Sequence, residues 1–358
     1  MPVSLGYLFG FCAWIIVLVA CFVLLLRRRR TLRGQTKRLR WVHLGLSAWM
    51  ALLLLTGCEA FFAFFVDHSD AFNMTNVSKR WFEQHIDRER NDFGNRDVEP
   101  FLRNTPDGTH RICFIGDSFT VGHGIENIAD RFTDRVAAGL NRKFPGKYLV
   151  ANLGSPGLEI AQIEGKLRDV LKKEYDVGTF VYVICLNDIE YYDKRTEQNL
   201  AQLRDAQPHT FLFTKTYFLN WMYFRFVQAT RPEVRDYFSY LNESYRSEAW
   251  TYFRLHLDGM RAACKADGVE FRVIVFPFMQ KLGDEHPFRD AHKIIVDYCQ
   301  PRGIPVLDLE PVMGEHAGEN LTVNRFDAHP NEAAHAIAAD AILEQLLSEN
   351  PVSPGASP

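Results

Sequence analysis

The sequence predicts an α/β domain with a parallel sheet, preceded by two transmembrane helices. From residue 110 onward, short apolar runs alternate with longer amphipathic segments, which is the pattern of a doubly wound α/β domain. The first 66 residues differ in kind, because they hold two long apolar stretches. A chain of 358 residues has room for one large domain and additional segments.

The two apolar stretches, Leu5 to Leu26 and Trp41 to Val66, are each long enough to cross a bilayer. Residues 27–40 between them hold eight basic residues and no acidic one. The positive-inside rule places this loop in the cytoplasm, so that both ends of the hairpin face outward. We therefore expect residues 1–66 to form a hairpin in the cell membrane, with the lipid bilayer as a partner. The rest of this multi-pass protein is then extracytoplasmic.

The charge outside the hairpin loop argues against a nucleic-acid partner. Without the eight basic residues of the loop, 33 of the 41 Lys and Arg residues remain against 44 Asp and Glu, a balance of about −11. The basic loop itself needs no explanation beyond topology and anionic lipid.

The second apolar stretch contains a competing signal. Residues 55–58, Leu-Thr-Gly-Cys, have the form of a lipobox, at which a bacterial lipoprotein is cut and Cys58 is acylated. Against this, a full apolar span precedes the motif and the apolar run continues beyond it to Val66. Glu59 in the same stretch could be a functional intramembrane carboxylate, but its place near the outer end favours a solvated side chain.

The remaining elements follow from periodicity. Residues 67–109 are polar and irregular, and we expect them to connect the hairpin to a domain at 110–350. Strands are expected at 111–115, 148–152, 180–184, 270–276 and 304–307. Helices are expected at 128–144, 159–175, 246–267, 290–299 and 331–348. The last of these follows His329-Pro330 directly, which would place His329 at a helix N-terminus whose dipole lowers its pKa. The tail, 351–358, is expected to be disordered.

Residues 191–245 interrupt this alternation and are too long for a simple connection. Aromatic residues crowd the centre of this insertion: Phe211, Phe213, Tyr217, Phe218, Trp221, Tyr223, Phe224 and Phe226. They could form a substrate platform, lie against the bilayer, or make the core of a helical insertion.

Three polar motifs follow strand ends or lie near the C-terminus. Gly116-Asp117-Ser118 ends the first strand, Asn187-Asp188 follows the third, and Asp327-Ala328-His329 precedes the last helix. The carboxyl ends of parallel strands share one edge of a sheet, where open α/β folds bind ligands. A nucleophile, an amide donor, an acid and a base thus occur in one chain order.

This set resembles the SGNH (GDSL-type) hydrolase family over roughly the last 260 residues. The resemblance implies a three-layer αβα domain. Gly157 is the better match to the glycine of the second block, with Gly154 as the alternative. Cys185 stands where the third block usually has glycine. Asp327 lies two residues before His329, where three is common, and this spacing is similar to the polysaccharide O-acetylation branch.

The residue types fit acyl transfer. His329 would remove the proton of the Ser118 hydroxyl, and Asp327 would orient the imidazole. The backbone N–H groups of Ser118 and Gly157 and the side-chain amide of Asn187 would form the oxyanion hole. The sequence shows no metal-ligand spacing and no glycine-rich phosphate loop, so we expect neither a metal nor a cofactor.

Two functions remain open at this point. The first is a membrane-anchored serine esterase or O-acyltransferase that acts on a small ester or an acylated exported glycan, with a membrane acyl-donor protein as a candidate partner. The second is a catalytically idle domain that binds glycan or scaffolds an export complex, suggested by Cys185 and the aromatic insertion. Asp308, at the end of the strand expected at 304–307, competes with Asp327 as the triad acid.

Overall fold

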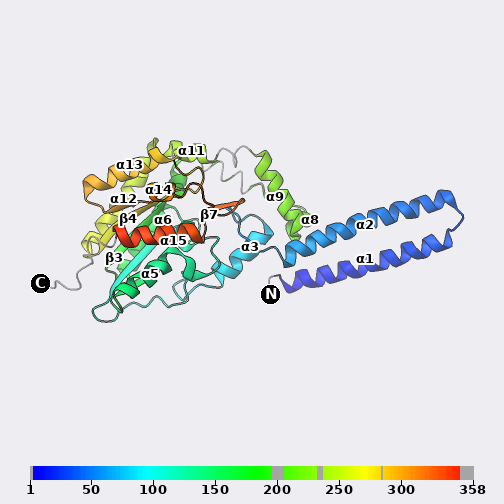
Figure 1. The fold of residues 1–358 in the computed structure, drawn as a ribbon, viewed down its shortest axis with the longest axis horizontal. Coiled ribbons are helices and arrows are strands. Elements are labelled where there is room, and N and C mark those ends of the chain that lie inside the picture. The colour runs from blue at the N-terminus through cyan, green and yellow to red at the C-terminus, as the bar shows by residue number, and fades with distance from the viewer. Residues whose placement is uncertain are drawn as a thin grey trace. The chain divides into compact units, whose positions relative to one another are not determined.

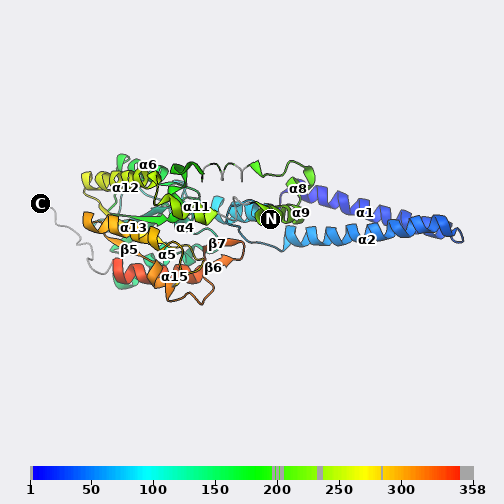
Figure 2. The same cartoon turned by 90° about the horizontal axis from the view of Figure 1, so that it is seen from above.

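A computed structural model of the protein describes residues 3–195, 198, 201, 205–231, 237–283 and 285–346 (Figures 1 and 2). The predicted tail, 351–358, lies outside the described residues. The chain forms two compact units. The first comprises described residues of Met1–His68, Asn73–Gln84 and Gln207–Thr230, and the second those of Ser69–Phe72, His85–Ala206 and Arg231–Pro358. The segments 67–109 and 191–245 are thus divided between the units.

The first unit is built on a helical hairpin. Its helices are α1 (Leu5–Thr31), α2 (Thr36–Phe64), α3 (Asn76–Phe82), α8 (Phe211–Lys215) and α9 (Phe218–Thr230). Both α1 and α2 are long and apolar enough to span a membrane, and only 6% and 11% of their most apolar windows are buried. A core helix of a soluble domain would bury most of such a window, so these helices present an apolar surface outward.

Polar and aromatic contacts hold the hairpin together. The indole N–H of Trp14 donates to Thr56 Oγ1 at 3.0 Å, and that of Trp49 donates to the Leu18 carbonyl at 2.9 Å. The Phe22 and Trp49 rings stack with centroids 4.4 Å apart. Side-chain hydrogen bonds of this kind join helices where water is scarce. Cys58 lies inside α2, which continues past it without a break.

The second unit contains a five-stranded parallel sheet in the order β2-β1-β3-β4-β5. The strands are β1 (His110–Gly116), β2 (Tyr148–Asn152), β3 (Thr179–Cys185), β4 (Glu270–Phe276) and β5 (Val306–Asp308). The chain moves from β1 outward to β2 and then returns to the other side of β1 to form β3. The loops after β1 and β3 therefore diverge at this switch point, which is where doubly wound sheets place their sites.

Helices cover both faces of this sheet (Figure 2). The helices α6 (Ile160–Lys172) and α12 (Glu248–Ala266) pack together on one face, and α5 (Phe132–Lys143) and α15 (Glu332–Ala341) on the other. The predicted three-layer α/β fold is confirmed. The remaining elements are α4 (Ser118–Val121), α11 (Tyr237–Ser244), α13 (Arg289–Cys299), α14 (Glu310–Gly314) and the antiparallel pair β6 (Thr322–Asn324) and β7 (Asp327–Pro330). Short 3₁₀ or π turns span Glu83–Asp87, Ile128–Asp130, Leu186–Tyr192, Gln300–Arg302 and Ile342–Leu346.

Two sequence-based expectations about helices are wrong. The helix expected at 128–144 is interrupted at Arg131, whose extended backbone separates a 3₁₀ turn from α5. His329 lies in strand β7 and not at a helix N-terminus. The helix α15 begins at Glu332, because the Asn331 side chain caps it by accepting from the N–H groups of Ala333 and Ala334.

Candidate active site

Ser118 lies directly after β1, at the start of the short helix α4. The turn between them requires Gly116, since a Cβ there would clash with the Thr120 hydroxyl and come within 2.6 Å of the Val183 carbonyl. The buried Asp117 side chain caps α4 by accepting from the Phe119 N–H at 2.9 Å. The close approach of β3 and the cap together fix the serine at the carboxyl edge of the sheet.

The structure brings Ser118, His329 and Asp327 into one hydrogen-bonded chain. His329 Nε2 lies 2.8 Å from Ser118 Oγ, and its Nδ1 lies 2.5 Å from Asp327 Oδ1. The same carboxylate oxygen accepts from the His329 backbone N–H at 3.1 Å. A neutral imidazole that donates from Nδ1 to the carboxylate leaves Nε2 to accept the serine proton. Asp327 and His329 both lie in strand β7 (Asp327–Pro330), where residues two apart share one face, so the two-residue offset places the carboxylate beside Nδ1.

Burial and charge act in opposite directions on this pair. Burial alone would raise the pKa of Asp327, but the charge and hydrogen bond of His329, with His123 and Ser69, hold that pKa well below its usual range. Burial alone would lower the pKa of His329. The Asp327 carboxylate, helped by Asp117 and Asp70, instead raises the pKa of His329 above its ordinary value. Each member of the pair stabilises the charged form of the other.

Sequence reasoning missed two residues that contact the triad. The Ser69 hydroxyl donates to Asp327 Oδ2, the oxygen that His329 does not use. The His123 ring stacks on His329 with centroids 4.3 Å apart, and its Nε2 lies 3.6 Å from Asp327 Oδ2. Burial lowers the pKa of His123 to about 4, so this ring is neutral near pH 7. No sequence signal marks Ser69, whereas His123, five residues after the nucleophile motif, could have been flagged.

His123, Asp327 and His329 also offer three potential metal-ligand atoms within 4.8 Å of one another. Both ring nitrogens of His329, however, already lie at hydrogen-bond distance from Asp327 and Ser118. The two imidazoles are stacked 20° from parallel, an arrangement in which their lone pairs do not converge on one point. The geometry fits a hydrogen-bonded triad better than a metal centre.

The two candidate glycines of the second block differ in their surroundings. The Gly154 N–H donates to Asn152 Oδ1 at 2.9 Å, and a Cβ there would lie 2.5 Å from the Val121 backbone nitrogen. Gly154 therefore serves close packing against α4. Gly157 lies exposed in a turn with a φ of +70°, and its N–H makes no hydrogen bond within the described part of the chain. The Gly154 N–H is therefore already paired, whereas the Gly157 N–H is available to a bound group among the residues that the structure describes.

Asn187 lies in the first turn after β3 and is partly buried. Asp188 beside it holds this turn, accepting from the Tyr182 hydroxyl at 2.7 Å and the Cys185 N–H at 3.3 Å. The Cys185 backbone, with φ −92° and ψ 139°, is ordinary extended chain. The position thus needs no glycine, and the departure from the family motif leaves the turn intact.

Asp308, the competing acid, lies elsewhere in the site's unit. Its Oδ1 lies 2.6 Å from His292 Nδ1 and accepts from the Glu310 N–H at 3.0 Å. Asp308 therefore caps the start of α14 and pairs with a different histidine. The structure places Asp327, and not Asp308, against His329.

Residues 114–337, more than half of the chain, match the family model described as the GDSL-like lipase/acylhydrolase family. The chain belongs to this family. No curated protein matches it. The nucleophile block, Asn187 and the Asp327–His329 pair all lie inside the matched range.

Several solved structures are similar to part of the chain. One is a member of the lipolytic G-D-S-L family from Veillonella parvula DSM 2008, with 14% identity and a TM-score of 0.40 over 67% of this chain and 99% of that one. Another is LAE5, an α/β hydrolase from the metagenome of Lake Arreo, Spain, with 14% identity and a TM-score of 0.44 over 68% of this chain and 98% of that one. A third is a catalytic mutant of Axe2, an acetylxylan esterase from Geobacillus stearothermophilus, with 13% identity and a TM-score of 0.43 over 68% of this chain and 96% of that one.

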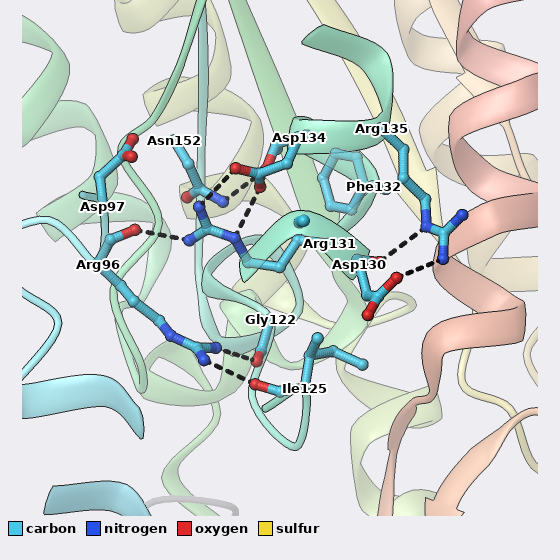
Figure 3. Close-up of polar contacts among 12 residues, drawn as sticks. Arg96, Asp97, Gly122, Ile125, Asp130, Arg131, Phe132, Asp134, Arg135 and Asn152 are labelled. Carbon is cyan, nitrogen blue, oxygen red and sulfur yellow. Dashed lines mark hydrogen bonds and ion pairs between the residues drawn. The ribbon is translucent and has the colours of Figure 1, made fainter. Parts of the chain in front are cut away.

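Two buried arginines hold the loops around the Gly116-Asp117-Ser118 motif. The Arg96 guanidinium donates to the carbonyls of Gly122 at 2.8 Å and Ile125 at 2.7 Å, on either side of His123 (Figure 3). Arg131 in turn donates to the Arg96 carbonyl at 2.6 Å and pairs with Asp134. Arg96 thereby fixes the loop that carries the ring stacked on His329.

Lys166 holds the loop of the second family block, which leads to Gly157, through three hydrogen bonds. Its ammonium donates to Asn95 Oδ1 at 2.9 Å, to the Leu153 carbonyl at 2.7 Å and to Ser155 Oγ at 2.9 Å. These contacts use all three of its N–H donors. Burial lowers the pKa of Lys166 to about 8. The neighbours Asn95 and Arg96 thus brace the loops before Gly157 and after Ser118.

Proposed function

We propose that the protein is a membrane-anchored serine esterase or O-acyltransferase that acts on an ester outside the cytoplasm. The observation that carries the proposal is the chain of hydrogen bonds from Ser118 Oγ through His329 to Asp327. A serine hydroxyl becomes a nucleophile when a neutral imidazole accepts its proton, and here that imidazole is buried, oriented and paired.

The reaction uses these groups in sequence. Ser118 Oγ attacks the ester carbonyl carbon while its proton moves to His329 Nε2. The carbonyl oxygen becomes an oxyanion, which accepts hydrogen bonds from the Ser118 and Gly157 N–H groups and the Asn187 amide. The intermediate collapses, the bond to the alcohol breaks, and the alcohol leaves with the proton from His329. Water or a sugar hydroxyl then attacks the acyl-serine in the same way and releases Ser118.

The acceptor in the second step decides between the two activities. Water gives an esterase, and a glycan hydroxyl gives an O-acyltransferase from the same acyl-enzyme. A transferase would need an acyl donor on the outer side of the membrane, which a membrane partner could supply. The alternative of a catalytically idle scaffold has less support, because the backbone at Cys185 has no need of the glycine that the family motif carries there.

Turnover of p-nitrophenyl acetate tests the chemistry. The wild type should release p-nitrophenol in a steady state, and Ser118→Ala should not. A mixture with an oligosaccharide acceptor then separates transfer from hydrolysis by the appearance of acetylated sugar. Equal rates for wild type and Ser118→Ala would remove the serine nucleophile from the proposal.

The location rests on the hairpin and its basic loop. Alkaline phosphatase, which matures only outside the cytoplasm, can be fused after residue 346 of the full chain. We expect an active fusion, and we expect the same reporter inserted within residues 27–40 to be inactive. The opposite pattern would place the domain in the cytoplasm.

A further inference from the structure

The aromatic part of the insertion, residues 207–230, belongs to the same unit as the apolar hairpin. Glu59 of α2 makes the connection. Its carboxylate accepts hydrogen bonds from the Tyr217 N–H at 2.7 Å and the Phe218 N–H at 2.8 Å, which lie at the start of α9. It also accepts from the Tyr7 hydroxyl of α1 at 2.6 Å. The first N–H groups of a helix lack partners within it, so Glu59 caps α9 from another helix.

Ring contacts and amide bonds reinforce this connection. The Phe62 ring of α2 lies 5.3 Å from that of Phe218 and 5.1 Å from that of Trp221. The buried Asn220 side chain accepts from the Asn76 N–H at 2.7 Å, which joins α3 to α9. The segment is therefore packed on the outer end of the hairpin by both polar and apolar contacts.

The other side of this segment carries large apolar side chains without cover. Phe211 and Leu212 of α8 and Met222 and Phe226 of α9 are between 47% and 73% exposed. Met222 and Phe226 are four residues apart and share one face of α9. Phe61 and Phe65, at the end of α2, are also exposed and stack on each other with centroids 6.1 Å apart.

We infer that α8 and α9 lie at the extracytoplasmic surface of the membrane that the hairpin spans. Their exposed apolar side chains would enter the lipid there. The occupant is the bilayer because Glu59 fixes the start of α9 at the outer end of the apolar span. The exposed face of the segment thereby continues the apolar surface of the hairpin. The basic residue Lys215 is exposed at the end of α8, where lipid phosphates would meet it.

This inference rests on the proposed membrane anchoring and is independent of the ester chemistry. It assigns Glu59 a role that differs from the solvated side chain expected from the sequence. The carboxylate holds an interfacial helix pair to the hairpin.

Site-specific photocrosslinking in lipid tests the inference. The full-length protein would carry benzoylphenylalanine at Phe226, Phe61 or Leu255, one position at a time. It would be reconstituted in phosphatidylcholine–phosphatidylglycerol vesicles. Leu255 of α12 is the matched control, because it is an apolar residue of the second unit whose exposed fraction, 59%, lies between those of Phe61 and Phe226. We expect lipid adducts from positions 226 and 61 in comparable yield, and none above background from 255.

Each other outcome has a distinct meaning. Lipid adducts from position 61 but not 226 would overturn the interfacial segment and leave the anchoring intact. Absence of adducts from both positions would overturn the anchoring as well. A protein–protein crosslink from 226, to a second copy or to another membrane protein, would replace lipid as the occupant. Glu59→Leu should reduce the lipid adducts from position 226 and leave those from 61 unchanged, and an unchanged yield at 226 would remove the anchoring role of Glu59.

Discussion

Two carboxylates, Asp327 in the second unit and Glu59 in the first, each accept a hydrogen bond from a residue far away in the sequence. Asp327 receives hydrogen bonds from His329 and Ser69, and Glu59 from Tyr7, Tyr217 and Phe218. The difference lies in the partners. His329 can gain and lose a proton near neutral pH, whereas a phenol and two backbone N–H groups remain donors. The first arrangement therefore suits proton transfer, and the second suits assembly.

The largest expected effect comes from removing the charge of Asp327. Asp327→Asn should lower kcat for p-nitrophenyl acetate by about 10⁴-fold, because the amide no longer orients the imidazole or stabilises the imidazolium. The thermal midpoint should change little. Asp308→Asn is the control and should keep wild-type turnover, since Asp308 pairs with His292. The reverse ranking of the two variants would make Asp308 the triad acid.

The next effect concerns the oxyanion. Asn187→Ala should lower kcat by about 10²–10³-fold with a smaller change in KM, because the donor acts on charge that develops in the transition state. Cys185→Gly, two residues earlier, restores the family residue and should leave turnover unchanged. A large gain of activity in Cys185→Gly would show that the cysteine distorts the site.

The pH dependence should follow the base. A protonated imidazole cannot accept the serine proton, so activity is lost as the pH falls through the pKa of His329. Because Asp327 raises this pKa, the acidic limb of kcat/KM should lie above 6.5, the ordinary value. In the residual activity of Asp327→Asn the limb should move to lower pH. A limb below pH 6 in the wild type would contradict the pairing.

The smallest effect on turnover should come from the other carboxylate. Glu59→Gln keeps the shape of the side chain but loses its charge, which weakens the cap of α9 by about 1–3 kcal/mol. We expect faster hydrogen exchange in residues 217–221 and unchanged hydrolysis of p-nitrophenyl acetate by the full-length protein. A loss of turnover comparable to that of Asp327→Asn would break the separation between the two carboxylates.

Local patterns predicted most of the fold. The strands at 148–152 and 270–276 have the expected bounds, because each is a short, largely apolar run between turn residues. The order of Ser118, Asn187, Asp327 and His329 along the chain was also sufficient to nominate the residues that the structure brings to one edge of the sheet. These features could be read from the sequence because each strand and each motif is a contiguous run of residues.

What the sequence could not reveal depends on contacts between distant segments. Ser69 meets Asp327 across 258 positions, and Glu59 meets Tyr217 across 158. The interruption of the expected helix at Arg131 also involves a contact with a distant segment, because the Arg131 side chain donates to the carbonyl of Arg96. The start of the last helix, by contrast, could have been placed better. Asn331 is a stronger N-cap than the residues before it, and His329 precedes a proline, which favours extended backbone.

The most direct measurement of the central claim is the covalent labelling of the full-length protein by a fluorophosphonate, mapped by peptide mass spectrometry. We predict one modified serine, Ser118, in the wild type and no adduct in Ser118→Ala. His329→Gln should be labelled far more slowly, because its side chain cannot serve as the base that removes the serine proton. An unlabelled wild type that is folded and membrane-bound, or an adduct on a different serine, would contradict the assignment of this site.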